Sequence, residues 1–145
     1  MACRDMNRII ADNPMHCRQW PASIALENLS EALGLMGPNL SFFVDGSYQF
    51  ADVLQVLHSC DHKRLTALLK KFVCAAKLNG QEVNEGAFNI VYGGDLARVF
   101  DVFAFVCEVN YRDFFEQGAT PPEQDQSEQS EEQLEPDLLM QSMTP

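Results

Sequence analysis

Apolar positions recur at helical spacing along most of the first 116 residues. The first run begins after Pro21 and ends before Gly37–Pro38, as expected for a helix that opens at a proline and stops at a glycine. Its apolar residues are three and four positions apart, which places them on one helix face: Ala22, Leu26, Leu29, Leu33 and Met36. We therefore predict a helix from Ala22 to Met36.

Two longer runs and one short run follow. Ser47 is a suitable N-cap for a second helix, and Asn79–Gly80 is a suitable stop for a third. The expected buried positions of the second helix are Phe50, Val53, Leu54, Leu57 and Cys60. Those of the third are Leu65, Leu68, Leu69, Phe72, Val73 and Ala76. The short run Phe88–Tyr92 predicts a fourth helix, and the loop between the first two carries an apolar plug, Phe42–Val44.

The most apolar stretch of the chain runs from Leu96 to Val109, with eleven apolar residues among fourteen. Asp95 can cap a helix that opens there. At about 100° per residue, the three polar residues Arg98, Asp101 and Glu108 fall within an arc of roughly 80°. Arg98 and Asp101 are three positions apart and can pair. We predict a central helix that its neighbours bury on most sides, with one accessible polar edge.

No segment sustains an alternation of apolar and polar residues, and residues 1–20 show no regular pattern. The predicted fold class is therefore all-α, a compact bundle of about five helices around the central apolar helix. Residues 1–116 form the predicted helical domain. Residues 117–145 hold seven acidic residues and no Lys or Arg, and they are rich in Pro, Gln, Ser and Glu. We predict that this tail is disordered.

Charge and cysteine content narrow the function classes. The net charge of −11 divides into −7 for residues 117–145 and −4 for the rest, which argues against binding to nucleic-acid phosphates. The basic residues Lys63, Arg64, Lys70, Lys71 and Lys77 are best explained as a solvated helix face. Five cysteines without repeated spacing, and no signal peptide, favour reduced thiols in the cytosol or nucleus. No apolar stretch is long enough for a transmembrane helix.

Candidate catalytic and metal-binding groups are few. His58, Cys60 and His62 have metal-like spacing, but Cys60 would point away from the two histidines and no second ligand pair stands nearby. His16–Cys17 has no identifiable third group for nucleophilic catalysis. The sequence also lacks a phosphate-binding loop. We therefore predict no enzyme activity, no catalytic or metal-binding residues and no cofactor.

The segment DLARVFDVFAF, Asp95–Phe105, resembles the first homology motif of the Bcl family of apoptosis regulators. Arg98 stands at the arginine of that motif, while Leu96 and Ala97 stand where the family has Trp and Gly. Val99, Phe100, Phe103 and Phe105 follow the apolar pattern. FADVLQVLHSCD, Phe50–Asp61, resembles the third homology motif at Val56, Cys60 and Asp61. The resemblance is greatest to divergent viral members, of the adenovirus small T antigen and gammaherpesvirus types.

This resemblance implies an early viral protein that inhibits apoptosis by holding an amphipathic helix of a Bax- or Bak-like host protein in an apolar groove. The partner's Asp would pair with Arg98. The implied groove residues are Arg98, Asp95, Leu96, Val99, Phe100, Phe103, Phe88, Val91, Phe50, Val53, Leu54, Leu57, Leu68, Leu69 and Phe72. The protein would act in the cytoplasm or nucleus of the host cell, and peripherally at mitochondria through its partners.

A second hypothesis assigns the function to the tail. LEPDLLMQSM mixes acidic residues with Leu134, Leu138, Leu139 and Met140, as short linear motifs do when they fold on a partner. The chain would then be a helical adaptor that recruits transcription or ubiquitin machinery. Deletion of residues 117–145 distinguishes the two hypotheses, because only the adaptor requires the tail.

Overall fold

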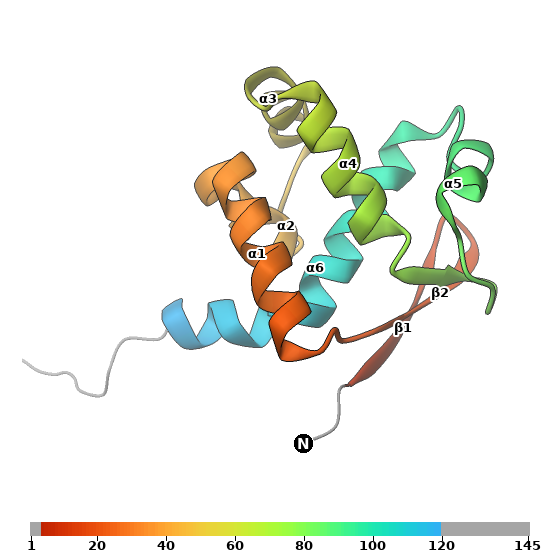
Figure 1. Cartoon of the computed structure of the whole chain (residues 1–145), viewed down its shortest axis with the longest axis horizontal. Helices are drawn as coiled ribbons and strands as arrows, with labels where there is room; N and C mark the ends of the chain where they lie inside the picture. The colour runs from red at the N-terminus through yellow and green to blue at the C-terminus, as the bar shows by residue number, and fades with distance from the viewer. Residues whose placement is uncertain (1–3, 120–145) are drawn as a thin grey trace, which may run out of the picture. The chain divides into compact units, whose positions relative to one another are not determined.

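The computed structural model describes residues 4–119 and divides the chain into two units, Met1–Arg112 and Asp113–Pro145. The predicted all-α class is wrong, because the first unit contains a three-stranded antiparallel sheet beside its helices and is therefore α+β (Figure 1). The elements are β1 (Asp5–Ile10), β2 (Asn13–Arg18), α1 (Ala22–Met36), a 3-10 turn (Gly37–Asn39), α2 (Leu40–Val44), α3 (Phe50–Ser59), α4 (His62–Val73), β3 (Ala76–Leu78), α5 (Glu85–Val91) and α6 (Leu96–Ala119).

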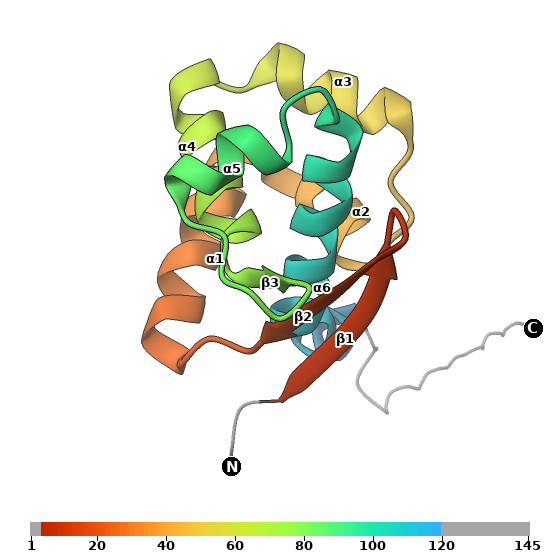
Figure 2. The ribbon, with the colours of Figure 1, turned by 90° about the vertical axis from the view of Figure 1, so that its right-hand side faces the viewer.

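The sheet begins with a tight hairpin that the sequence pattern did not reveal. Met6 lies opposite Cys17 and Arg8 lies opposite Met15, while β3 pairs with the other edge of β2 (Figure 2). The hairpin turns at Ala11 and Asp12, which both have positive φ values, 50° and 66°. Two-residue hairpin turns of type I′ have positive φ at both central residues, and they usually carry Asn-Gly or Asp-Gly. Ala-Asp is not such a signal, and Arg8 interrupts the apolar alternation of its strand.

Helix boundaries follow the sequence signals in part. The prediction for α1 is confirmed, and Gly37 at its end has a φ of 63°. The predicted N-cap Ser47 is wrong, because Gln49 and Asp52 form a reciprocal capping box at the start of α3. The predicted third helix also ends early, at Val73, since the chain then turns into β3. Asn79–Gly80 instead forms the turn after that strand.

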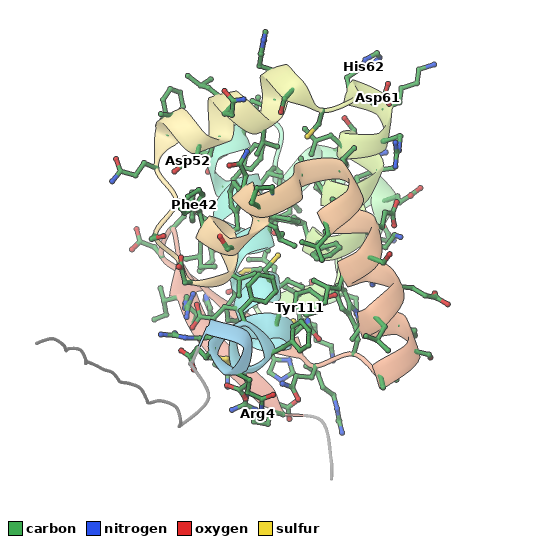
Figure 3. The ribbon with its side chains drawn as sticks, turned by 90° about the vertical axis from the view of Figure 1, so that its left-hand side faces the viewer. Arg4, Phe42, Asp52, Asp61, His62 and Tyr111 are labelled. Carbon is green, nitrogen blue, oxygen red and sulfur yellow. The ribbon has the colours of Figure 1, made fainter. Side chains whose placement is uncertain are left out.

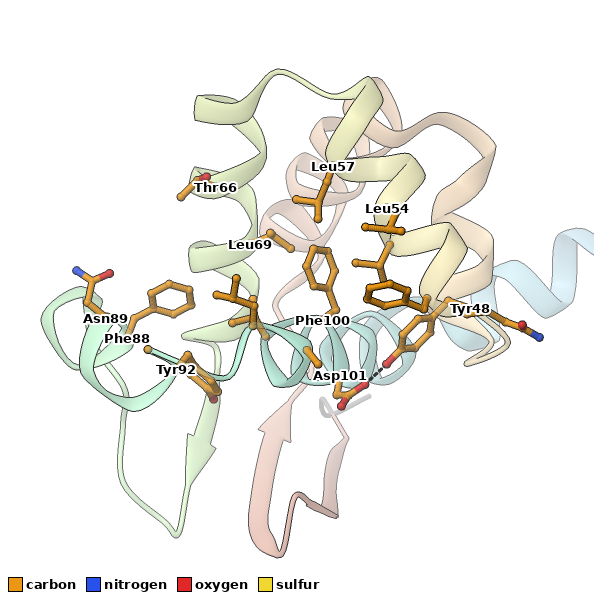
Figure 4. Close-up of a pocket in the computed structure, with 17 residues that line it drawn as sticks. Tyr48, Leu54, Leu57, Thr66, Leu69, Phe88, Asn89, Tyr92, Phe100 and Asp101 are labelled. Carbon is orange, nitrogen blue, oxygen red and sulfur yellow. Dashed lines mark hydrogen bonds between the residues drawn. The ribbon is translucent and has the colours of Figure 1, made fainter.

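The first part of α6 is the centre of the first unit, which confirms its predicted burial. Val102, Phe103, Phe105, Val106 and Cys107 are completely buried. The ring of Phe103 lies 5.0 Å from that of Phe72 on α4 and 5.5 Å from that of Phe43 on α2. On the other side, the Arg8 guanidinium of β1 lies 5.1 Å from the centre of the Phe105 ring. The part of the helix that lies in the first unit is therefore enclosed between the sheet and the other helices (Figure 4).

The three polar residues between Leu96 and Val109 do not share one accessible edge. Glu108 is only 9% exposed, and its carboxylate accepts hydrogen bonds from Arg8 at 2.8 Å and from Arg112 at 2.9 Å. Arg98 pairs with Asp95, so the expected pair with Asp101 is wrong. Only Asp101 is exposed. A buried charge must be paired, and Glu108 has one partner on its own helix, Arg112, and one that is one hundred residues away, Arg8.

Two further expectations concern membranes and the tail. Within residues 4–119 no helix combines the length and the apolar character that a membrane crossing requires. The predicted tail residues Leu134, Leu138, Leu139 and Met140 lie outside the described residues. The division into a helical domain and a disordered tail therefore stays a prediction.

Candidate functional site

A groove with a volume of about 640 Å³ opens between α3, α4, α5 and the first turns of α6 (Figure 4). This volume lies within the usual range of binding pockets. The lining is mostly apolar, and it consists of Tyr48, Gln49, Phe50, Val53, Leu54, Leu57, Thr66, Leu69, Phe88, Asn89, Tyr92, Gly93, Leu96, Ala97, Val99, Phe100 and Asp101.

The α3 wall of the groove exposes large apolar side chains. Phe50, Leu54 and Leu57 are 72%, 49% and 50% exposed, respectively. Their spacing of four and three residues places them on one helix face. Val53, which also lines the groove, and Val56, farther round the helix, are buried and anchor α3. An apolar patch left open to water is costly, and such patches usually mark binding surfaces.

The floor of the groove is buried and tightly packed. Leu69 of α4 and Val99 and Phe100 of α6 are between 5% and 7% exposed. Phe100 packs beside Phe43, with ring centres 6.3 Å apart. The groove therefore combines a fixed floor with an accessible apolar wall.

One end of the groove is fixed by the contact between α5 and α6. Asn84 caps α5 by accepting a hydrogen bond from the Ala87 amide at 2.8 Å. The ring of Phe88 lies 5.4 Å from that of Tyr92. Burial raises the pKa of Tyr92, although the nearby Arg98 partly opposes this effect. Tyr92 is thus a neutral, buried support for Phe88.

Arg98, the predicted contact for a partner, is not among the lining residues. Its side chain is 15% exposed, and its guanidinium lies 5.0 Å from the centre of the Tyr92 ring. Nη2 donates a hydrogen bond to the Val91 carbonyl oxygen at 2.6 Å, and Nε lies 3.4 Å from a carboxylate oxygen of Asp95. The side chain therefore joins α5 to α6 behind the groove.

The opposite end of the groove is closed by Tyr48. Its hydroxyl donates a hydrogen bond to the Asp101 carboxylate, and its ring stacks on Phe43 at 4.8 Å. Burial raises the pKa of Tyr48, and the hydrogen bond to Asp101 raises it further. The phenol is therefore a stable donor at neutral pH. It holds the loop before α3 against α6.

The structure brings together nine of the fifteen predicted groove residues: Leu96, Val99, Phe100, Phe88, Phe50, Val53, Leu54, Leu57 and Leu69. Three others, Phe103, Leu68 and Phe72, are completely buried in the core. Asp95, Val91 and Arg98 form the connection between α5 and α6. That the nine lining residues contact a partner stays a prediction.

Sequence reasoning missed eight residues of the lining: Tyr48, Gln49, Thr66, Asn89, Tyr92, Gly93, Ala97 and Asp101. Most are polar or small, so an apolar stripe does not identify them. Helical spacing offers a partial signal, since Thr66 lies three residues before Leu69, and Ala97 lies three residues before Phe100. Tyr48 lies in a loop and gives no such signal.

The cysteines and histidines do not form a reactive centre within residues 4–119. No group of three His, Cys, Asp or Glu side chains there is placed to hold a metal ion. His62 lies on the outer surface at the start of α4 (Figure 3), and the Cys60 thiol donates a hydrogen bond to the Leu35 carbonyl oxygen at 3.1 Å. Burial raises the pKa of Cys17 to about 12, so its thiol stays protonated and poorly nucleophilic.

Comparison with known proteins identifies the relevant family. A family model described as phage tail assembly chaperone protein, TAC, matches residues 16–122, which is well over half of the chain and includes the whole groove. No curated protein and no solved structure matches the chain significantly.

This match corrects the functional interpretation of the sequence. The resemblance to the Bcl family is wrong, and with it the inhibition of apoptosis and the Bax- or Bak-like partners. The expected location in the cytoplasm or nucleus of such a host cell, or at mitochondria, is also wrong. The adaptor hypothesis has no support from the match. An arginine near the start of a buried apolar helix was too general a pattern, because Arg98 has a structural role here and donates a hydrogen bond to the Val91 carbonyl oxygen at the end of α5.

Proposed function

The chain belongs to the phage tail assembly chaperone family, and we propose that it is a non-enzymatic chaperone that holds an apolar segment of a bacteriophage tail protein in the groove. It would act in the cytoplasm of the infected bacterium while tails are assembled. Subunits of permanent assemblies generally pack against one another through largely apolar interfaces. A chaperone that covers one such surface prevents premature association until assembly begins.

The observation that carries this proposal is the exposed apolar wall of α3 beside the buried floor. Full burial of a Leu or Phe side chain contributes roughly 1.5–3 kcal/mol. Phe50, Leu54 and Leu57 together therefore offer several kcal/mol of gross binding free energy. The loss of translational, rotational and side-chain freedom on binding offsets part of this free energy. The resulting affinity would be moderate, which suits a chaperone because its client must leave for the growing tail.

The same geometry supports a binding role over a catalytic one. Asp101 is the sole charged residue of the lining, and its carboxylate accepts the Tyr48 hydrogen bond. General acid–base catalysis needs a titratable group that can reach a substrate proton. The groove offers apolar area and few polar atoms, which is the composition of a surface that recognises an apolar segment.

Leu57→Asp tests the proposal. Leu57 is half exposed, so its replacement should leave the fold intact while it places a charge in the groove. A phage that lacks this chain would be complemented with the variant, and complete tails would be counted by electron microscopy. We expect a large loss of tails. Leu26→Asp is the matched control, because Leu26 is 63% exposed on α1 and lies outside the groove. Equal tail yields from the two variants would refute the proposal.

A further inference from the structure

The rim of the groove is asymmetric in charge, and the asymmetry indicates what kind of segment the groove accepts. Resting on the proposed function, we propose that the occupant is an amphipathic helix of the tail protein that carries acidic residues along the edge facing α4. The inference has two parts, a helical conformation and a charged edge. Each part follows from a separate feature of the groove.

The helical conformation of the occupant is inferred from the backbone of the groove walls, which are themselves helices. The groove is formed mainly by α3, α4, α5 and α6, whose backbone groups are largely satisfied within the helices. An extended segment binds well where it can add to the free edge of a sheet, and no strand contributes to this lining. A helix satisfies its own backbone and can therefore enter an apolar groove without such an edge. The row Phe50, Leu54 and Leu57 also suits a partner with apolar residues at helical spacing.

The acidic edge of the bound helix is inferred from two lysines of α4. Lys63 lies three residues before the lining residue Thr66, and Lys70 lies four residues after it, so both lysines border the groove on that wall. Neither lysine has an ion-pair partner among residues 4–119. Lys71 points elsewhere and pairs with Glu31 on α1. Among the described residues, the two rim lysines are therefore cations without an ion-pair partner.

The opposite wall supplies no charge of its own to the lining. The lining residues of α3 are apolar, and Gln49 before them is neutral. At the α5 end, Glu85 lies four residues before the lining residue Asn89, so the positive rim is confined to α4. Lys63 and Lys70 are seven residues apart, which corresponds to about 10 Å along a helix. Acidic residues about two turns apart on a bound helix would match this spacing.

Peptide binding to the full chain tests this inference directly. The probes are three labelled helical peptides of about 18 residues that share one apolar face and carry Glu, Gln or Lys along one edge, two turns apart. Fluorescence anisotropy would measure the dissociation constants. We expect the Glu peptide to bind roughly 3- to 10-fold more tightly than the Gln peptide, as exposed ion pairs provide. The Lys peptide should bind most weakly.

The overall charge of the protein makes the order of the three peptide affinities informative about the local charge of the groove. The chain carries a net charge of −11, and long-range attraction alone would favour the Lys peptide. A preference for the Glu peptide can therefore arise only from a local positive surface. The double variant Lys63→Glu, Lys70→Glu should reverse the order. Arg64→Glu is the matched control, because Arg64 lies about 160° around α4 from Thr66 and should leave the order unchanged.

The outcomes separate this inference from the proposed function. If all three peptides bind equally to the wild type and to the double variant, the acidic edge is refuted, whereas the groove remains a site for apolar segments. If none of the peptides binds, the helical occupant is refuted. A dimer in sedimentation that Leu57→Asp dissolves would identify a second copy of this chain as the occupant and would also refute the inference. Circular dichroism would verify that every variant is folded.

Discussion

The guanidinium of Arg98 donates a hydrogen bond to the carbonyl oxygen of Val91 at 2.6 Å, and this contact joins the start of α6 to the end of α5. The carbonyl belongs to the last turn of α5, where such groups lack a partner within the helix. The same guanidinium covers the ring of Tyr92, which lines the groove. Arg98 therefore supports the α5 end of the groove from behind.

Arg98→Ala should destabilise the protein. The substitution removes a charge-assisted hydrogen bond and leaves the Val91 carbonyl oxygen without its donor, which costs roughly 1–3 kcal/mol of the free energy of unfolding. Urea denaturation would measure the loss. Asp95→Asn is the control, since the Asp95 carboxylate is half exposed and its ion pair should contribute less than 1 kcal/mol. An unchanged stability of Arg98→Ala would contradict this structural role.

Tyr48 and Asp101 should prove energetically coupled. Tyr48→Phe removes the hydrogen bond to Asp101 but keeps the stacking on Phe43. We expect a loss of about 0.5–1.5 kcal/mol in the free energy of unfolding. Asp101→Ala should cost a similar amount, and the double variant should cost less than the sum of the two. Additive losses in this double-mutant cycle would show that the two side chains act independently.

The alkaline limit of stability should depend on tyrosine ionisation. The pKa values of all three tyrosines, Tyr48, Tyr92 and Tyr111, are raised, in each case chiefly by burial. Figure 3 labels Tyr111, whose hydroxyl donates a hydrogen bond to the Ala25 carbonyl oxygen at 2.8 Å. A raised pKa means that the folded state holds its protons more tightly than the unfolded state. The stabilisation is therefore complete below about pH 10, the unfolded pKa, and is lost as the pH rises further.

Absorbance at the phenolate band would measure this effect. At pH 10 the unfolded chain in denaturant should have about half of its tyrosines ionised, whereas the folded protein should show little phenolate. The free energy of unfolding should fall between pH 10 and the higher pKa values of the folded protein. Half-ionised tyrosines in the folded protein at pH 10 would contradict the burial that the structure assigns to them.

The apolar periodicity predicted much of the helical part, and the reason is physical. Leu29 and Met36 of the predicted α1 stripe pack into the core, whereas Leu26 and Leu33 are exposed. Gly37 ends the helix with a positive φ that glycine tolerates. The helical spacing of apolar residues does not show, however, whether another element packs on the face that they form. Phe50, Leu54 and Leu57 have the spacing of core residues, and yet they are exposed in the groove. Only the positions of α4, α5 and α6 show that nothing in the described fold covers them.

The hairpin depends on contacts between residues distant in sequence, and the role of Arg98 depends on its contacts with the end of α5. β1 is stabilised by pairing with β2 and by the contact between Arg8 and Glu108, which are one hundred residues apart. No local pattern contains that information. Similarly, Arg98 was predicted to be accessible because helix geometry alone ignores α5. The Val91 carbonyl and the Tyr92 ring occupy the space that a partner would have needed.

The hairpin turn offers a final prediction, in which one kind of substitution has opposite effects at two sites. Ala11 has a φ of 50°, a conformation that costs an L-residue with a Cβ roughly 1–2 kcal/mol. Ala11→Gly relieves this strain but makes the unfolded chain more flexible, so we expect a net gain of up to about 1 kcal/mol in the free energy of unfolding. Ala67→Gly is the control, since Ala67 is exposed in the middle of α4 and glycine there should cost about 0.8–1 kcal/mol. Thermal and urea denaturation would measure both. If Ala11→Gly destabilised the protein as much as Ala67→Gly, the turn would not have the backbone geometry described for it.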